Sequence, residues 1–316
     1  MNESVPREEH RHQWALDLSR SGQRRYEDEK DRRRPPEALK TPEKLYEGYL
    51  FDLDGTIYLG DELLPGAKRL VLKLRELEKR VIFLTNNPTR NPGMYAEKLT
   101  RLGLKTPPEE VVNTVVTMTG WLLQNHPEAV VFPISEEPLK NSLREAGIKM
   151  SEDPEEIDIV IASYDRGFDY RKLQIAFDAI WFHKRAKLVT TNPDRYCPLP
   201  GGRGEPDAAA IVGAIEGCTG TKCEVNVGKP DPIMLETVMG LLDLDAKDCV
   251  MTGDRLYTEI RMALDAGMPS AVVLTGETTA EDLDEESEEN LPAYVLGRID
   301  HLVPADLRRE FGWEDA

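Results

Sequence analysis

The sequence predicts an α/β protein, in which a doubly wound parallel-sheet core contains a second, smaller α/β domain as an insert. From residue 48 onward, short apolar runs alternate with segments of helical periodicity, which is the order that a parallel sheet requires. The middle of the chain carries further strands and helices, enough for a domain of its own. We therefore expect a charged extension at 1–45, the first part of the core at 46–111, the inserted domain at 112–204 and the rest of the core at 205–316.

The spacing of apolar residues defines the elements of the core. The run Tyr49–Phe51 is continuous, as is typical of a strand buried on both faces, whereas Leu70, Leu74 and Leu77 recur at helical intervals. The acidic run at 281–289 is expected to lie on the surface. The same criteria predict core strands at 49–51, 81–85, 224–227, 249–252 and 270–274, and core helices at 67–79, 94–102, 208–215, 232–242 and 258–266.

The inserted domain continues the alternation of strands and helices. A loop at 198–204, rich in proline and glycine, is expected to return the chain to the core. The elements expected before this loop are strands at 129–133, 157–162 and 187–191 and helices at 139–146 and 170–182.

The composition narrows the classes of partner. The chain has 316 residues, of which 40% are hydrophobic and 31% charged, and its net charge of −18 argues against nucleic-acid backbones and anionic membranes as main partners. No apolar run is long enough to span a membrane, and the first residues lack a signal-peptide core. The four cysteines lack zinc-site spacing and are expected to be reduced thiols in a cytoplasmic protein.

The first 45 residues differ in composition from the rest of the chain. Acidic and basic residues alternate there with few apolar ones, and Pro35–Pro36 would stop a helix. We expect a disordered or loosely helical extension. The alternative is a docking arm that uses Arg32–Arg34. This interpretation is less favoured because the neighbouring acidic residues nearly cancel the positive charge.

Polar side chains follow four of the expected strands, at the points where the strands end. The carboxyl ends of parallel strands meet at one edge of a sheet, which is where open α/β sheets bind their ligands. Each residue alone is also typical of a turn, a strand or a surface position, so the prediction depends on the whole set occurring in order. The set consists of Asp52 and Asp54, Thr85 and Asn86, Lys229, and Asp254.

This set resembles the motifs of the haloacid dehalogenase (HAD) superfamily, whose members have a Rossmann-like core. The sequence reads DLDGT at 52–56, FLTNN at 83–87, GKPDP at 228–232 and GDRLYTE at 253–259, in the order that the family shows. The resemblance extends from residue 48 to the C-terminus. With TNPD at 191–194 and a large insert after the second motif, the chain is most similar to the sugar-phosphatase and p-nitrophenylphosphatase branch, in which the insert forms a cap.

The resemblance implies a phosphatase mechanism based on two carboxylates. Asp52 would attack phosphorus and form an aspartyl-phosphate, and Asp54 would protonate the leaving alkoxide and then accept a proton from water. Asp52, Asp254 and the main-chain carbonyl of Asp54 would bind Mg²⁺, which prefers oxygen ligands. The family often has aspartate where Glu259 stands, as a support for the metal, so the extra methylene leaves the metal affinity open.

The same resemblance assigns the phosphate contacts and the class of substrate. Thr85, the backbone around Asn86 and Lys229 would hold the phosphoryl oxygens. A large cap favours small phosphorylated metabolites, such as a sugar phosphate, because it closes over the strand ends and excludes polymers. A phosphotransferase or mutase, and a phosphate-ester-binding protein without turnover, are the alternatives. A homodimer formed through the cap is also left open.

Specificity is expected to come from the cap segment 191–198. It combines two prolines with polar, cationic, aromatic and thiol side chains, and the alternative is a rigid return turn. Some relatives that act on vitamin-B6 phosphate have histidine where Cys197 aligns, so its absence favours sugar phosphates or other small esters. The candidate residues are Asn192, Asp194, Arg195, Tyr196 and Cys197.

Overall fold

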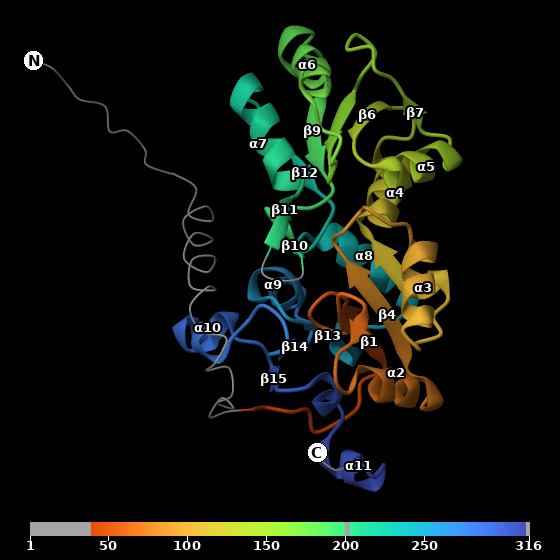
Figure 1. The fold of residues 1–316 in the computed structure, drawn as a ribbon, viewed down its shortest axis with the longest axis vertical. Helices are drawn as coiled ribbons and strands as arrows, with labels where there is room; N and C mark the ends of the chain where they lie inside the picture. The colour runs from red at the N-terminus through yellow and green to blue at the C-terminus, as the bar shows by residue number, and fades with distance from the viewer. Residues whose placement is uncertain (1–38, 200–202, 314–316) are drawn as a thin grey trace, which may run out of the picture. The chain divides into compact units, whose positions relative to one another are not determined.

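The computed structural model describes residues 39–199 and 203–313. Most of the extension expected at 1–45, including Arg32–Arg34, lies outside the described residues. The described chain contains two larger parallel sheets and two small hairpins. Figure 1 shows the first sheet with its helices below and the second sheet above it, as labelled.

The first sheet is six-stranded and parallel, in the order β15-β14-β13-β1-β4-β5. The first strand of the chain therefore lies in the middle, and later strands are added on both sides of it. Such a reversal of strand order is where doubly wound sheets place their ligands. The strands are β1 (Gly48–Asp52), β4 (Arg80–Thr85), β5 (Val111–Asn113), β13 (Cys249–Gly253), β14 (Ser270–Val273) and β15 (Tyr294–Leu296).

Both faces of this sheet are covered because its strands are apolar on both sides. Tyr49 and Phe51 pack into one apolar cluster with α2 and α3, and Leu50 packs into another with α8 and α9. Full burial of each such side chain contributes about 1.5–3 kcal/mol. The covering helices are α2 (Ala67–Glu76), α3 (Pro92–Arg101), α8 (Pro232–Leu242) and α9 (Arg261–Asp265), the last preceded by the π-helical turn η6 (Leu256–Ile260).

The second sheet is five-stranded and parallel, in the order β12-β9-β8-β6-β7. The predicted fold class is therefore confirmed: a doubly wound core with a separate α/β cap. Residues 114–226 are called the cap below. Its strands are β6 (Val130–Ile134), β7 (Lys149–Met150), β8 (Ile159–Ala162), β9 (Lys187–Thr190) and β12 (Val225–Asn226), and its helices are α4 (Thr114–Asn125), α5 (Glu137–Glu145), α6 (Tyr170–Phe177), η3 (Asp178–Phe182) and α7 (Ala208–Thr219).

The end of the cap differs from the boundary expected at residue 204. Strand β12 pairs with β9 of the cap sheet, and Ile211 and Ile215 of α7 pack into an apolar cluster of the cap. The segment expected to return the chain, 198–204, instead contributes to an antiparallel hairpin of β10 (Tyr196–Leu199) and β11 (Arg203–Pro206). The expectation that 205–226 belongs to the core is thus corrected, since the apolar face of α7 packs against the cap.

The remaining elements are short. The acidic run forms α10 and η7 and is largely exposed, as expected. The short elements are β2 (Tyr58–Leu59), β3 (Glu62–Leu63), η2 (Pro108–Glu110), η5 (Ala246–Asp248), α10 (Ala280–Glu285), η7 (Glu288–Asn290), η8 (Ile299–Leu302) and α11 (Ala305–Glu310).

Among residues 39–199 and 203–313, no helix combines the length and apolar character that a membrane crossing needs.

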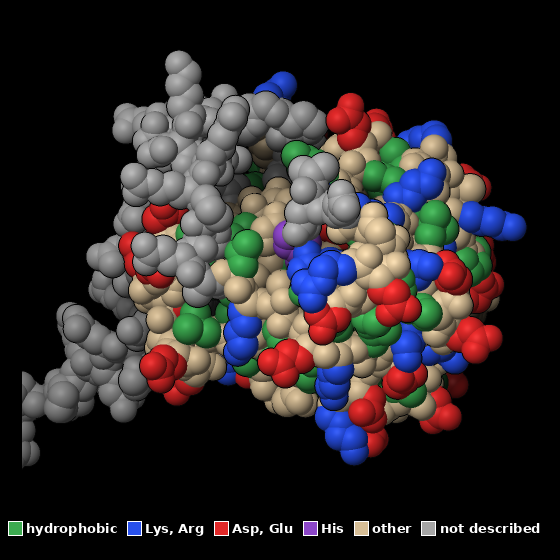
Figure 2. Space-filling model, turned by 90° about the horizontal axis from the view of Figure 1, so that it is seen from below, with side chains coloured by type: hydrophobic (Ala, Val, Ile, Leu, Met, Phe, Trp, Pro, Cys, Tyr) green, Lys and Arg blue, Asp and Glu red, His purple; other side chains and the backbone are tan. Residues whose placement is uncertain are grey.

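The surface carries charges of both signs. On the visible part of the face in Figure 2, Lys and Arg side chains alternate with Asp and Glu, and hydrophobic side chains occur in small groups. The net charge of −18 is therefore not gathered into one acidic patch on this face. All four cysteines lie within the described ranges, and no disulfide joins them.

Candidate active site

The ends of three adjacent strands bring polar residues together. Asp52 is the last residue of β1 and Thr85 the last of β4, while Asp254 directly follows β13. Because β1 pairs in parallel with both neighbours, these three residues lie at the same edge of the sheet. Lys229 reaches this edge by another route. It follows β12 of the cap sheet, so the expectation that it ends a strand of the core sheet is wrong.

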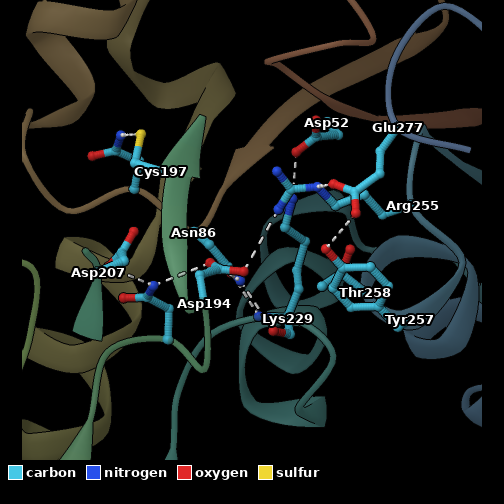
Figure 3. A network of polar contacts seen from close by, with 12 residues as sticks. Asp52, Asn86, Asp194, Cys197, Asp207, Lys229, Arg255, Tyr257, Thr258 and Glu277 are labelled. Carbon is cyan, nitrogen blue, oxygen red and sulfur yellow. Dashed lines mark hydrogen bonds and ion pairs between the residues drawn. The ribbon is translucent and has the colours of Figure 1, made fainter. Parts of the chain in front are cut away.

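Lys229 links two buried carboxylates at this edge. Its side chain is 2% exposed, and its Nζ forms ion pairs with Asp52 and, at 2.6 Å, with Glu259 Oε1. Burial alone would lower the pKa of Lys229, but the two carboxylates outweigh burial and raise it, so the ammonium stays charged. The contact between Lys229 and Asp52 is drawn in Figure 3.

Glu259 lies against the lysine. Its Oε2 accepts a hydrogen bond of 2.8 Å from Thr258 Oγ1. Burial acts to raise the pKa of Glu259, but Lys229 and Arg255 hold it below its usual range. Gly253 makes room for this carboxylate, because a Cβ there would lie 2.3 Å from Glu259 Cγ. The glutamate that stands where the family often has aspartate is thus in direct contact with Lys229.

Asp254 is a buried acid that backbone groups enclose closely. Its Oδ2 accepts a hydrogen bond of 2.7 Å from the backbone N–H of Glu277, whereas its Oδ1 is buried without a hydrogen-bond partner. Gly55 and Gly276 approach so closely that a Cβ would lie 2.5 and 2.0 Å, respectively, from Asp254 Oδ2. Burial, opposed by Arg255 and assisted by Glu259, raises the pKa of Asp254 to about 7.

These acids form a site that fits a cation with oxygen ligands. Burial, Glu259 and Asp254 raise the pKa of Asp52 against the effect of Lys229, so a further cation here would favour its charged form. The unpartnered Oδ1 of Asp254 is an acceptor that a cation would satisfy. Among the described residues, no group of three or more His, Cys, Asp and Glu side chains surrounds one metal position. The ion that fits would therefore also need backbone and water oxygens, as Mg²⁺ commonly does.

Asp54 occupies a different environment from Asp52. Its side chain is exposed, and Tyr58 Oη donates a hydrogen bond of 3.1 Å to its Oδ2. Desolvation by the surrounding protein raises the pKa of Asp54, even though the side chain keeps access to solvent, and Lys98 opposes this shift. Two neighbouring carboxylates thus differ in exposure and in partners, an arrangement that suits two different roles.

The side chain of Asn86 holds the backbone of Lys229. Its Nδ2 donates to the carbonyl of Lys229 at 3.0 Å, and its Oδ1 accepts from the N–H of Lys229 at 2.8 Å. Thr85 Oγ1 accepts a hydrogen bond of 3.2 Å from the backbone N–H of Asn87. Asn86 therefore fixes the position of the lysine, while its own backbone remains the candidate for phosphate contact.

The cap segment 191–198 meets the core through some of its candidate residues. Asn192 is buried, and its Nδ2 donates to Asp194 Oδ2 and Asp207 Oδ1, both at 3.0 Å. Cys197 Sγ lies 3.6 Å from Asn87 Nδ2, and burial raises the pKa of the Cys197 thiol to about 11. The candidates Arg195 and Tyr196 are exposed. The structure thus brings Asp194 and Cys197 into contact with the core, whereas the side chain of Asn192 bonds to residues of the cap (Figure 3 labels Asp194 and Cys197).

Arg255 is a residue of the site that the sequence analysis did not single out. Its Nε lies 3.0 Å from Glu277 Oε2, and its Nη1 lies 3.6 Å from Asp194 Oδ1. Its charge also acts on two acids of the site, because it opposes the rise in the pKa of Asp254 and helps to lower the pKa of Glu259. The only local signal was its place directly after Asp254 in GDRLYTE, and its partners come from distant parts of the sequence.

Comparisons with known proteins agree with this geometry. Residues 49–149 match the family of haloacid dehalogenase-like hydrolases, and residues 226–302 match a HAD-hydrolase-like family. The acid sugar phosphatase of Staphylococcus haemolyticus is 33% identical over 79% of this chain and 93% of the relative. The sugar-phosphatase AraL of Bacillus subtilis is 33% identical over 80% of this chain and 90% of the relative.

Solved structures give the same result. The 4-nitrophenylphosphatase of Thermotoga maritima superposes with a TM-score of 0.76 at 32% identity, covering 81% of this chain and 96% of that one. The p-nitrophenyl phosphatase of Archaeoglobus fulgidus has a TM-score of 0.75 at 31% identity, covering 82% and 98%. The chain therefore belongs to the haloacid dehalogenase-like hydrolases, and within them it is a phosphomonoester phosphatase of the branch that includes the sugar phosphatases and nitrophenylphosphatases.

Proposed function

We propose that this protein is a Mg²⁺-dependent phosphatase that hydrolyses small phosphomonoesters, such as sugar phosphates, through an aspartyl-phosphate intermediate on Asp52. The observation that carries the proposal is the pair of carboxylates at the end of β1. Asp52 is buried against a charged lysine, whereas Asp54 is open to solvent. The printed names of the relatives, acid sugar phosphatase and sugar-phosphatase, support the class of substrate.

The first half of the reaction transfers the phosphoryl group to the protein. A carboxylate oxygen of Asp52 attacks phosphorus, and the bond between phosphorus and the leaving oxygen breaks. Asp54 gives its proton to that oxygen, so the alcohol leaves uncharged. Lys229, Thr85 Oγ1 and the backbone around Asn86 hold the phosphoryl oxygens, because charge neutralisation and positioning dominate phosphoryl transfer.

The second half of the reaction restores Asp52. The ionised Asp54 now accepts a proton from a water molecule, whose oxygen attacks phosphorus and displaces the carboxylate of Asp52. Free phosphate leaves, and both aspartates are returned to their starting states. Asp52, Asp254 and the main-chain carbonyl of Asp54 would hold Mg²⁺, which neutralises phosphoryl charge when it is bound.

Two substitutions at the end of β1 test the mechanism. Asp52→Asn should abolish turnover, because an amide does not attack phosphorus. Asp54→Asn should lower kcat/KM for a sugar phosphate about 10²–10⁴-fold. The loss should be smaller for p-nitrophenyl phosphate, because nitrophenolate leaves without a proton. Asp61→Asn is the control, since Asp61 is an exposed acid between β2 and β3.

The measurement is the steady-state release of phosphate from a panel of phosphometabolites, with Mg²⁺ and with excess chelator. The proposed function predicts that phosphate is released only when Mg²⁺ is present. Asp61→Asn should release it at the wild-type rate. Two results would contradict it: an Asp52→Asn protein that keeps a tenth of the wild-type rate, or full activity in excess chelator.

A further inference from the structure

One cap residue, Asp194, is tied to the core at the edge where the active-site carboxylates lie. Its Oδ2 accepts a hydrogen bond of 3.0 Å from Asn86 Nδ2, and its Oδ1 lies 3.6 Å from Arg255 Nη1. The Asp194 side chain is 10% exposed and that of Arg255 is 18% exposed, so water screens this pair only weakly. The contact therefore joins the two sheets of the protein through charged groups.

The other side of Arg255 faces the loop that holds Asp254. Arg255 Nε lies 3.0 Å from Glu277 Oε2, and Tyr257 Oη donates a hydrogen bond of 3.1 Å to Glu277 Oε1. The backbone N–H of this same Glu277 donates the 2.7 Å hydrogen bond to Asp254 Oδ2. A continuous series of contacts thus runs from Asp194 through Arg255 and Glu277 to Asp254. Figure 3 labels the first three of these residues.

We propose that Arg255 is a positioning residue that couples the position of the cap to the orientation of Asp254, and hence to Mg²⁺ binding. With the cap in place, Asp194 and Glu277 together hold the guanidinium, and Glu277 keeps its N–H directed at Asp254. When Asp194 moves away with the cap, Arg255 loses one of its two ion-pair partners, and the shifted guanidinium draws Glu277 out of position. The inference rests on the proposed function for its metal, but its test does not require turnover.

The coupling has a defined direction and an expected size. Groups that orient a metal-binding carboxylate change metal affinity by about 10–100-fold when they are removed. Coupling between two sites is reciprocal, so a cap residue that does not touch the metal should still change its affinity, typically by about 5-fold or more. Arg255 is the only route for this effect in the proposal, so its removal should make the metal site insensitive to Asp194.

A cycle of variants tests this coupling, with Mg²⁺ binding to the full-length protein measured by calorimetric titration without substrate. The set comprises Arg255→Ala, Arg255→Lys, Asp194→Asn and the double variant Arg255→Ala with Asp194→Asn. Asparagine keeps the acceptor for Asn86 but removes the charge that faces Arg255. Arg261→Ala is the matched control, because Arg261 forms an exposed ion pair with Asp265 in α9. Circular dichroism confirms that each variant is folded.

The expected results separate coupling from simple structural damage. Arg255→Ala should raise the Kd for Mg²⁺ about 10-fold, and Arg255→Lys should recover part of the loss because it keeps the charge but not the fork of donors. Asp194→Asn should raise Kd about 5-fold in the wild-type background and not at all in Arg255→Ala. Arg261→Ala should bind as the wild type does.

Three results would overturn the proposal: no Mg²⁺ binding by the wild type, no effect of Asp194→Asn, or losses that multiply in the double variant. The test is independent of the phosphatase assay. If the cycle behaves as expected while no phosphomonoester is hydrolysed, the coupling stands and the proposed function fails.

Discussion

Replacing Lys229 with methionine tests how the buried charges of the site depend on one another. The side chain is 2% exposed and lies between Asp52 and Glu259. Methionine fills a similar volume but removes the ammonium, so two buried carboxylates lose their counter-charge. Removing one partner of a buried ion pair costs about 3–5 kcal/mol of unfolding free energy. With an unfolding entropy of about 2.1 cal/mol/K per residue, that is a fall in Tm of about 4–8 °C for a protein of this size.

The pH dependence of this loss follows from the signs of the charges. Without Lys229, the pKa values of Asp52 and Glu259 in the folded protein should rise above their unfolded values. The folded state then binds more protons than the unfolded state, so the variant becomes less stable as pH rises. Lys229→Met should therefore lose more stability at pH 8 than at pH 5. Adding Glu259→Gln should restore part of the loss, because glutamine can still accept from Thr258.

The assay is urea unfolding followed by circular dichroism at pH 5 and pH 8 in the absence of Mg²⁺. Lys79→Met is the control: its 2.7 Å ion pair with the exposed Glu47 lies at the surface, where such pairs contribute about 0–1 kcal/mol. A loss below about 1 kcal/mol at pH 8 for Lys229→Met would refute the view that this lysine compensates the buried acids.

Two further predictions concern the cap and its junction with the core. Burial raises the pKa of Asp207 to about 6, so its stabilising effect is present below about pH 4 and is lost as pH rises through 6. In urea unfolding, the free energy of unfolding of Asp207→Asn should equal that of the wild type near pH 4 and exceed it by about 2–3 kcal/mol at pH 8. An equal difference at both pH values would contradict this prediction. In Gly228→Ala, the new Cβ would lie 2.6 Å from the carbonyl oxygen of Thr191 and 2.8 Å from Asn86 Oδ1. The variant should lose about 1–3 kcal/mol of unfolding free energy and much of its kcat/KM. Gly213→Ala is the control and should lose neither, because Gly213 faces solvent.

The predicted features that the structure confirms depend on a general rule of parallel sheets. Asp52, Thr85 and Asp254 each follow a long apolar strand, and parallel pairing necessarily brings such ends to one edge. Local sequence was sufficient here because each strand is recognisable alone. The resemblance assigned Lys229 to the phosphoryl oxygens, and the structure adds its ion pair with Asp52.

The features that sequence reasoning missed depend on which sheet a short strand joins. Strand β12 has only two residues, Val225–Asn226, and nothing in such a short run shows that its partner is β9. The cap boundary and the origin of Lys229 were misplaced for this reason. Arg255 was missed because its significance comes from Asp194 and Glu277, whose approach is a product of the fold.

The route by which Lys229 reaches Asp52 has a consequence for synthesis of the protein. The two residues are separated by 177 positions, and the whole cap lies between them. At about 5–20 residues per second, a ribosome adds Lys229 about 10–35 s after Asp52. Loop closure over this distance also disfavours the contact until the intervening sheet has folded. A nascent chain therefore carries its first carboxylates for many seconds before it can complete the site, and partial chains released from the ribosome should be inert toward phosphate esters.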